Sequence, residues 1–384
     1  NKYPTQRNSQ MNREGPATEL ADIPFVNGEI VRGVAGALRL PLPAAPRIAV
    51  KPRAEAHEAY LRGIYLLRQR NYDGAVAPLQ EATLLDDRFA RAYAALARAR
   101  VGREIAPQED RPASEAAARK ALALDPELAD AHLALGDVLF QDRIDWKQAG
   151  AEYRRAVALA PGDAETHYTY ANYLVALGRI DEAIAAVERA RELDPASMAI
   201  NSDYAWFLYL ARRYDKAMRQ AHDTLKLVDI TQASLPGLVQ YGRVWSYWVL
   251  VYGSWRKGDE PMAASYFRER MRAFGQGAAT DNIQSLQKLM DWKIQDLEEK
   301  ARKGPVSLLS LAASCSVGGH TGKALDALEQ ECRQGADEHL FSYVAVEPVF
   351  DSLHGDPRFL RIVECTGIPR DAPAYQALQK EQRP

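Results

Sequence analysis

Apolar residues recur along most of the chain at the three- and four-residue spacing of an amphipathic helix. The helical stretches come in pairs that are separated by short turns, such as Gly178-Arg179. The pairs end at Asp-Pro or Ala-Pro steps, such as Asp125-Pro126 and Ala160-Pro161. Proline suits these boundaries because it stops one helix and can open the next. The pattern predicts an all-α chain of antiparallel helix pairs.

The helix pairs repeat along the sequence. The stretch KALALDPELADAHLALGDVLF, beginning at Lys120, superposes on RAVALAPGDAETHYTYANYLV, beginning at Arg155. A third stretch, RARELDPASMAINSDYAWFLYL, begins one period later at Arg189. This pattern resembles the tetratricopeptide repeat (TPR), whose period is about 34 residues. The resemblance implies a right-handed superhelix of stacked helix pairs, an α-solenoid.

The sequence divides into an array and two ends. Seven repeat units are expected, the last two degenerate, at residues 56–89, 90–128, 129–163, 164–197, 198–231, 244–277 and 305–338. The unit at 164–197 fits the repeat best, with small or apolar residues at the signature positions Ala171, Ala183, Val187 and Ala190. One unit cannot bury its own apolar face, so the units must stack. We therefore expect an N-terminal segment at 1–52, the array at 53–338, and a cap and tail at 339–384.

The two ends carry a more specific resemblance. Residues 29–40 are typical of an amphipathic helix, and a Pro/Ala-rich linker follows at 41–52. One interpretation is purely structural: this helix caps the open face of the first repeat. Together with the segment Glu347–Pro369, however, it resembles the TolB-like/TPR portion of CadC-type bacterial regulators and of TPR-tailed adenylate cyclases or kinases. No winged helix, cyclase or kinase domain is present, so the resemblance implies only an interaction or sensory module.

The C-terminal segment is too apolar for a free tail. It carries Phe341, Tyr343, Val346, Phe350, Leu353, Phe359, Leu360 and Ile362. Because an exposed terminal repeat would leave an apolar face in water, we expect residues 340–366 to cover the open end of the last repeat.

The charge balance narrows the classes of partner. Lys and Arg number 49 and Asp and Glu 51, which gives a net charge of −2. This balance argues against nucleic-acid or anionic-membrane binding, which needs a basic excess. No apolar run reaches the roughly 20 residues of a membrane span. The compartment is left open between the cytoplasm and, for a piece of a membrane-anchored regulator, the periplasm.

Motifs for chemistry are scarce, and we expect no catalytic residue, metal site or cofactor. The stretch Val317–Ala324 lacks the first glycine and the hydroxyl of a phosphate-binding loop, so an inter-helix turn is the better interpretation. His132 and His167 occupy equivalent positions in adjacent units, where buried, hydrogen-bonded histidines are favoured over a metal pair. Cys315 and Cys332 either bridge the last helix pair or, as favoured, are two inert core thiols.

Aromatic residues mark the candidate binding groove. Trp245, Trp248, Tyr252 and Trp255 fall on one stripe of a helix. They either fill the core between degenerate repeats or form a wall for a protein or peptide, or for a small apolar ligand. By their places in the repeat, the predicted groove residues are Tyr168, Asn172, Trp206, Tyr209, Trp245, Trp248, Tyr252, Trp255, Arg91 and Arg98. Asp130 and Asp137 face the two arginines, which favours a polar partner over a polyanion.

The sequence favours a recognition module over an enzyme. The main hypothesis is protein–protein or ligand recognition, as the sensory or scaffolding part of a bacterial signalling or transcription-regulatory protein. The alternative is a stand-alone adaptor that assembles an enzyme complex. An enzyme with a site in the superhelix groove is the least favoured, since no catalytic constellation is visible.

Overall fold

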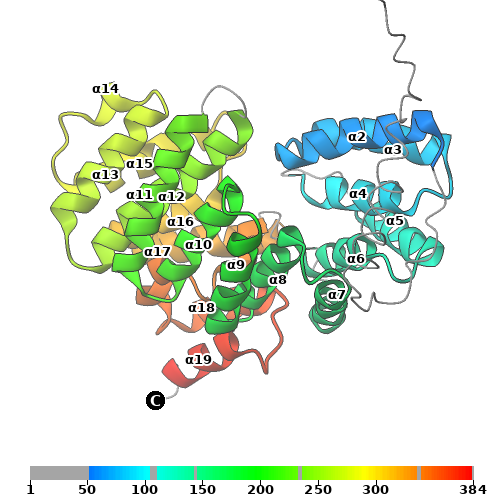
Figure 1. The fold of residues 1–384 in the computed structure, drawn as a ribbon. Coiled ribbons are helices and arrows are strands. Elements are labelled where there is room, and N and C mark those ends of the chain that lie inside the picture. Colours follow the sequence, from blue (N-terminus) through cyan, green and yellow to red (C-terminus); the bar gives the residue numbers. More distant parts are fainter. Residues whose placement is uncertain (1–51, 104–109, 142–144, 232–235, 335–338, 383–384) are drawn as a thin grey trace, which may run out of the picture.

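The computed structural model describes residues 52–103, 110–141, 145–231, 236–334 and 339–382 (Figure 1). Within these ranges every regular element is an α-helix or a 3-10 helix, which confirms the all-α prediction. The expected helix at 29–40 and the linker after it lie outside the described residues. The resemblance to TolB-like segments that rests on them therefore stays a prediction.

The helices pair as the repeat pattern predicts. The first five units are α2 (Ala54–Arg68) with α3 (Tyr72–Leu85), α4 (Ala90–Val101) with α5 (Asp110–Leu124), α6 (Ala129–Gln141) with α7 (Trp146–Leu159), α8 (Ala164–Ala176) with α9 (Ile180–Leu193), and α10 (Met198–Leu210) with α11 (Tyr214–Thr231). The two degenerate units are α12 (Pro236–Arg256) with α13 (Glu260–Ala273), and α16 (Leu308–Val317) with α17 (Thr321–Arg333). In each unit the two helices pack against each other.

Local sequence explains where helices start and how closely they pack. The side chains of Asp145, Asp163 and Ser197 each accept a hydrogen bond from the backbone of the first helical turn, which caps α7, α8 and α10. Gly136 faces Tyr153 across the third pair, where an added Cβ would lie 2.8 Å from the ring. Only glycine allows this approach, so a small residue is needed at that position.

Two helices between the degenerate units have no counterpart in the prediction. A short helix, α14 (Gly277–Thr280), leads to α15 (Leu286–Ala301), which packs against α13 and α16. Leu289 and Met290 of α15 are fully buried. Helix α15 therefore lies between the sixth and seventh units and packs against a helix of each.

The C-terminal segment does more than the predicted cap. It comprises η2 (His339–Tyr343), η3 (Pro348–Leu353), α18 (Pro357–Cys365) and α19 (Pro373–Glu381). As expected, η3 and α18 cover the last helix pair, α16 and α17. In addition, η2 contacts α8, η3 contacts α12, and Ala374 of α19 donates its N–H to the carbonyl of Leu177 after α8. Figure 1 shows this orange-to-red segment beside the green helices of the fourth and fifth units.

Aromatic contacts place this segment on the inner side of the array. Tyr343 packs edge-on against Trp206 of α10, with ring centroids 4.9 Å apart, and against Phe140 of α6 at 6.4 Å. These residues belong to first helices of their pairs, which line the inside of a superhelix of this kind. Phe341, Tyr343 and Phe350 belong to the same buried cluster as the helix pairs. The chain thus fills the inside of its own C-terminal half.

The cysteine pairing differs from the one considered for the sequence. Cys332 of α17 is bonded to Cys365 of α18, whereas Cys315 is a free, buried thiol. The Cys315–Cys332 bridge is therefore wrong, and the favoured interpretation of two inert thiols is wrong for Cys332, because Cys365 of the C-terminal segment lies beside it. Burial raises the pKa of the Cys315 thiol to about 11, as expected for an inert core thiol.

Replacing Cys365 by serine is expected to lower the free energy of unfolding by about 3–4 kcal/mol under oxidising conditions, because the bridge closes a loop over a sequence separation of 33. Urea denaturation with and without reductant measures the loss. Cys315→Ala is the control, and its effect should not depend on reductant. A wild-type protein whose stability ignores reductant would contradict the bridge.

Candidate partner-binding surfaces and the inner polar network

The predicted aromatic wall lies in the core. Trp206, Tyr209, Trp248 and Tyr252 are 3%, 0%, 7% and 2% exposed, and Trp245 is also buried. Trp255 is partly buried against the same cluster. The expectation of open ring faces is therefore corrected. The physical reason is the C-terminal segment, whose residues Tyr343, Glu347 and Phe350 cover the rings.

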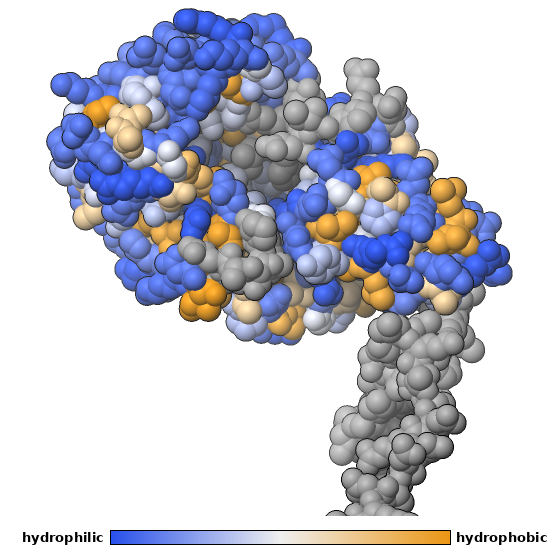
Figure 2. Space-filling view, turned by 90° about the horizontal axis from the view of Figure 1, so that it is seen from above, coloured by the Kyte–Doolittle hydropathy of each residue, from blue (hydrophilic) through white to orange (hydrophobic). Residues whose placement is uncertain are grey.

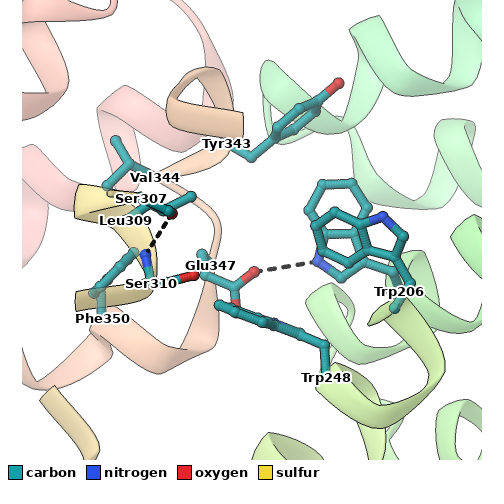
Figure 3. Close-up of a pocket in the computed structure, with 10 residues that line it drawn as sticks. Trp206, Trp248, Ser307, Leu309, Ser310, Tyr343, Val344, Glu347 and Phe350 are labelled. Carbon is teal, nitrogen blue, oxygen red and sulfur yellow. Dashed lines mark hydrogen bonds between the residues drawn. The ribbon is translucent and has the colours of Figure 1, made fainter. Parts of the chain in front are cut away.

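The rings enclose a small cavity with Glu347 at its wall (Figure 3). The indole Nε1 of Trp206 donates a hydrogen bond to Oε2 of Glu347 over 3.2 Å. The space open to the centres of water molecules is about 30 Å³, enough for about two waters. A peptide cannot enter it.

Glu347 is a buried acid without a basic neighbour. It is 6% exposed, and no Lys, Arg or His lines the cavity. Burial raises the pKa of Glu347 to about 7, although Tyr209, the indoles and the Val349 N–H act in the opposite direction. The carboxyl group therefore changes charge near neutral pH.

Glu347→Gln is expected to gain stability relative to the wild type as pH rises from 5 to 8. A carboxyl whose pKa is raised on folding contributes fully below its unfolded value of 4.5 and loses that contribution as pH passes about 7. The stability difference should grow by about 2–3 kcal/mol over this range. Urea denaturation at each pH measures it, and a difference that stays constant with pH would refute the raised pKa.

A buried polar network joins the first pair to the middle of the array. Arg70 lies in the α2–α3 turn with φ of 57° and donates to the Tyr168 hydroxyl over 2.5 Å. Tyr168 and Tyr241 donate to the two carboxylate oxygens of Asp203, each over 2.7 Å. The Arg70 guanidinium also lies 4.0 Å from the centre of the Tyr241 ring. Tyr168 is therefore a structural link between repeats here, not an open groove residue.

The other predicted groove residues of the middle units are also engaged. Arg98, which was predicted to orient a partner in the groove, instead pairs within the chain, with Asp137 over 3.0 Å and with Glu165. The Tyr153 hydroxyl donates to the same Asp137 over 2.9 Å. Asn172 donates to the carbonyl of Tyr168 within its own helix. Neither Arg98 nor Asn172 is left without a partner in the chain.

An accessible inner face remains on the first three pairs. Tyr60 and Ile64 of α2 are partly buried, whereas Arg91 of α4 and Asp130 of α6 are exposed. Arg68 of α2 is also exposed. The charges of Asp130, Arg91 and Arg68 act on the Tyr60 hydroxyl, whose pKa burial raises to about 12, so these groups lie around one ring. We call this set, Tyr60, Ile64, Arg68, Arg91 and Asp130, the N-terminal inner face.

The charges of this face have no fixed partners. Within the described part of the chain, none of Arg68, Arg91 and Asp130 forms an ion pair. On the side of the molecule seen in Figure 2, the surface is mostly hydrophilic, with hydrophobic residues in separate groups. The N-terminal inner face therefore offers both unpaired charge and apolar contact.

A shallow depression lined mostly by basic residues, at the α10–α11 turn, was not predicted from the sequence. Its lining includes Arg212, Arg213, Lys216, Arg219 and Lys257, together with Asp215. Most of the positive charge is compensated, because Arg212 pairs with Asp351, Arg213 with Asp181, and Lys257 with Asp215. Four of the cations are close in sequence, at the α10–α11 turn and the start of α11, and the fold adds Lys257, which follows α12.

The two equivalent histidines are hydrogen-bonded, as favoured from the sequence, but they are only partly buried. Both rings lie 3.0 Å from a carbonyl, that of Pro126 for His132 and that of Pro161 for His167. His132 also contacts Glu152 over 2.6 Å, which raises its pKa. Among the residues that the structure describes, no group of three or more His, Cys, Asp or Glu is placed to hold a metal ion. No helix in those ranges is long and apolar enough to cross a membrane.

Comparisons with known proteins identify the repeat. Family models described as tetratricopeptide repeat match residues 108–164, 145–199 and 174–226. A curated relative, the type IV pilus assembly protein PilF of Pseudomonas aeruginosa, is 43% identical over 65 residues, which cover 17% of this chain and 25% of PilF. The chain thus spans about a quarter of that relative's length.

Solved structures also match the chain over part of its length. PilW, described as a widely conserved type IV pilus biogenesis factor, is 16% identical, with a TM-score of 0.45, and the match covers 57% of this chain and 94% of PilW. A protein of Thermus thermophilus, described as a thermophilic TPR protein, is 19% identical, with a TM-score of 0.41, and the match covers 48% of this chain and 96% of that one. The resemblance to CadC-type regulators stays a prediction.

Proposed function

From the premise that this chain is a tetratricopeptide-repeat α-solenoid, we propose that it is an adaptor that binds a segment of a protein partner along its N-terminal inner face. The inside of a superhelix of this kind is its extended binding surface. In the C-terminal half that surface is occupied by the chain's own residues 339–382. The observation that supports the proposal is that Arg68 and Arg91, on the inside of the first two pairs, have no ion-pair partner in the described chain.

The residues of this face favour a segment of the partner that contains acidic residues and an apolar residue. Two exposed arginines stand against one exposed carboxylate, Asp130. Arginine binds carboxylates in a two-pronged geometry, and aromatic residues and arginine dominate the energetics of interfaces. Tyr60 and Ile64 would pack against the apolar side chain while the arginines bind the acidic groups.

An adaptor fits the comparisons better than a sensory module of a regulator. The curated relative, 43% identical over 65 residues, is named a type IV pilus assembly protein. A component of such an assembly is therefore one kind of partner to test. In the part of the chain that the structure describes, the N-terminal inner face is free to bind, whereas residues 339–382 occupy the inside of the C-terminal half. This arrangement would suit a protein that holds a partner without acting on it.

Photo-crosslinking tests where the partner binds. A photoreactive amino acid at position 64, on the inner face, should capture a specific protein in a cell extract. The same amino acid at position 84, where the exposed leucine lies on the second helix of the pair, should not. Capture at 64 should fall at least tenfold in Arg91→Glu and persist in Arg189→Glu, an exposed charge on α9. Equal capture at both positions, or capture that ignores Arg91, would overturn the proposal.

A further inference from the structure

The aromatic cavity has a composition that the adaptor function does not explain. Four parts of the chain form it: Trp206 from α10, Trp245 and Trp248 from α12, the start of α16, and the segment from Tyr343 to Phe350. Figure 3 shows the Glu347 carboxyl beside Trp206 and Trp248, with Tyr343 on another side and Leu309 and Ser310 across the space. A purely apolar junction would need no carboxyl group.

Two polar atoms at this cavity make no hydrogen bond of normal geometry within the described chain, although Tyr209 and the Val349 N–H also lie near the carboxyl. Oε2 of Glu347 accepts from Trp206, but Oε1 has no hydrogen-bond partner. The indole Nε1 of Trp248 also has none. An ionised carboxylate buried without a cation is costly, so an added positive charge would be stabilised strongly there.

The surrounding rings favour the same kind of ligand. The faces of indole and phenol rings carry negative charge density and attract cations, and aromatic cages of this type recognise organic ammonium groups. The Trp206 ring centroid lies 5.0 Å from that of Trp245 and 4.9 Å from that of Tyr343. Both of these rings pack against Trp206 and all three line the cavity, so a cation beside Glu347 would meet a carboxylate and aromatic side chains.

We propose that this cavity binds a compact organic ammonium ion, with the charge against Glu347 and the alkyl part among Trp206, Trp245 and Tyr343. Space of about 30 Å³ for water centres suits about two non-hydrogen atoms, as in methylammonium. Tetramethylammonium is too large. The half-buried Ser307 and Ser310 form the polar side of the lining, where the ion would enter.

Binding is measured on the full chain with ¹⁵N-labelled tryptophan, by titrating methylammonium chloride against matched sodium chloride. The indole N–H signals of Trp206 and Trp248 should shift saturably, with a Kd on the order of 10 mM for so small a ligand. Trp292 on α15 is outside the cavity and should not respond. Tetramethylammonium should cause no saturable shift.

Two variants connect the shift to the cavity. Glu347→Gln and Trp248→Phe, each first checked for native circular dichroism, should weaken binding at least tenfold. The ammonium group could belong to a lysine of a partner protein or to a free amine, and Nα-acetyl-lysinamide distinguishes the two. If it binds, the ligand is a partner's lysine; if it does not bind, the ligand is a free amine. A shift that sodium chloride reproduces, that includes Trp292, or that persists in both variants would overturn the proposal.

Discussion

Deleting residues 340–384 is expected to unfold the C-terminal half of the array. The deletion removes Phe341, Tyr343, Phe350 and Phe359, all at most 1% exposed, and uncovers Trp206 on α10. Loss of one large buried aromatic side chain costs about 3–5 kcal/mol, whereas whole domains are stable by only about 5–15 kcal/mol. The removed contacts therefore exceed the stability available to the units that they hold together.

Thermal melting and size-exclusion chromatography measure this loss. The truncated chain should aggregate or lose its cooperative transition, because α16, α12 and α10 would expose apolar surface to water. A shorter truncation after Gly367 is the matched control, since it removes α19 but keeps η2, η3 and α18. It should cause a much smaller fall in Tm. An unchanged melting curve for the longer deletion would show that the segment is not part of the core.

Asp203→Ala is expected to cost about 3–5 kcal/mol of stability, because it removes the acceptor of two buried tyrosine hydroxyls and the charge opposite Arg70. Asp203→Asn keeps an acceptor and should cost less. Urea denaturation measures both variants. Since the network joins the α2–α3 turn to α8, α10 and α12, hydrogen exchange in α2 and α3 should also become faster. A loss below about 1 kcal/mol with unchanged exchange would contradict the role of the network.

The local architecture could be predicted because it is encoded locally. The spacing of apolar residues and the Asp-Pro steps place each predicted unit on a helix pair, and the small residue Gly136 is where two helices approach. The inner positions of Arg98 and Asp137 in adjacent repeats also follow from the spacing, although their ion pair is seen only in the structure. These features depend only on residues in the same repeat unit or in the adjacent one.

The path of the C-terminal segment could not be predicted, because it depends on contacts between distant residues. Phe341 to Phe350 are clearly apolar in the sequence, but nothing in their order says that they lie against α6, α8 and α10. The stripe from Trp245 to Trp255 has the same spacing whether it faces a partner or the chain itself. For the same reason, spacing alone does not identify Cys365 as the residue beside Cys332.

The affinity of the captured partner for the double variant Arg68→Glu/Arg91→Glu tests the central claim most directly. Isothermal titration should give a Kd about 100-fold weaker than for the wild type, because each reversal replaces an attraction with a repulsion worth about 1–2 kcal/mol. The variant Trp248→Phe, altered only in the aromatic cavity and away from the N-terminal inner face, should bind like the wild type. An unchanged Kd for the double variant would show that the partner does not bind the N-terminal inner face.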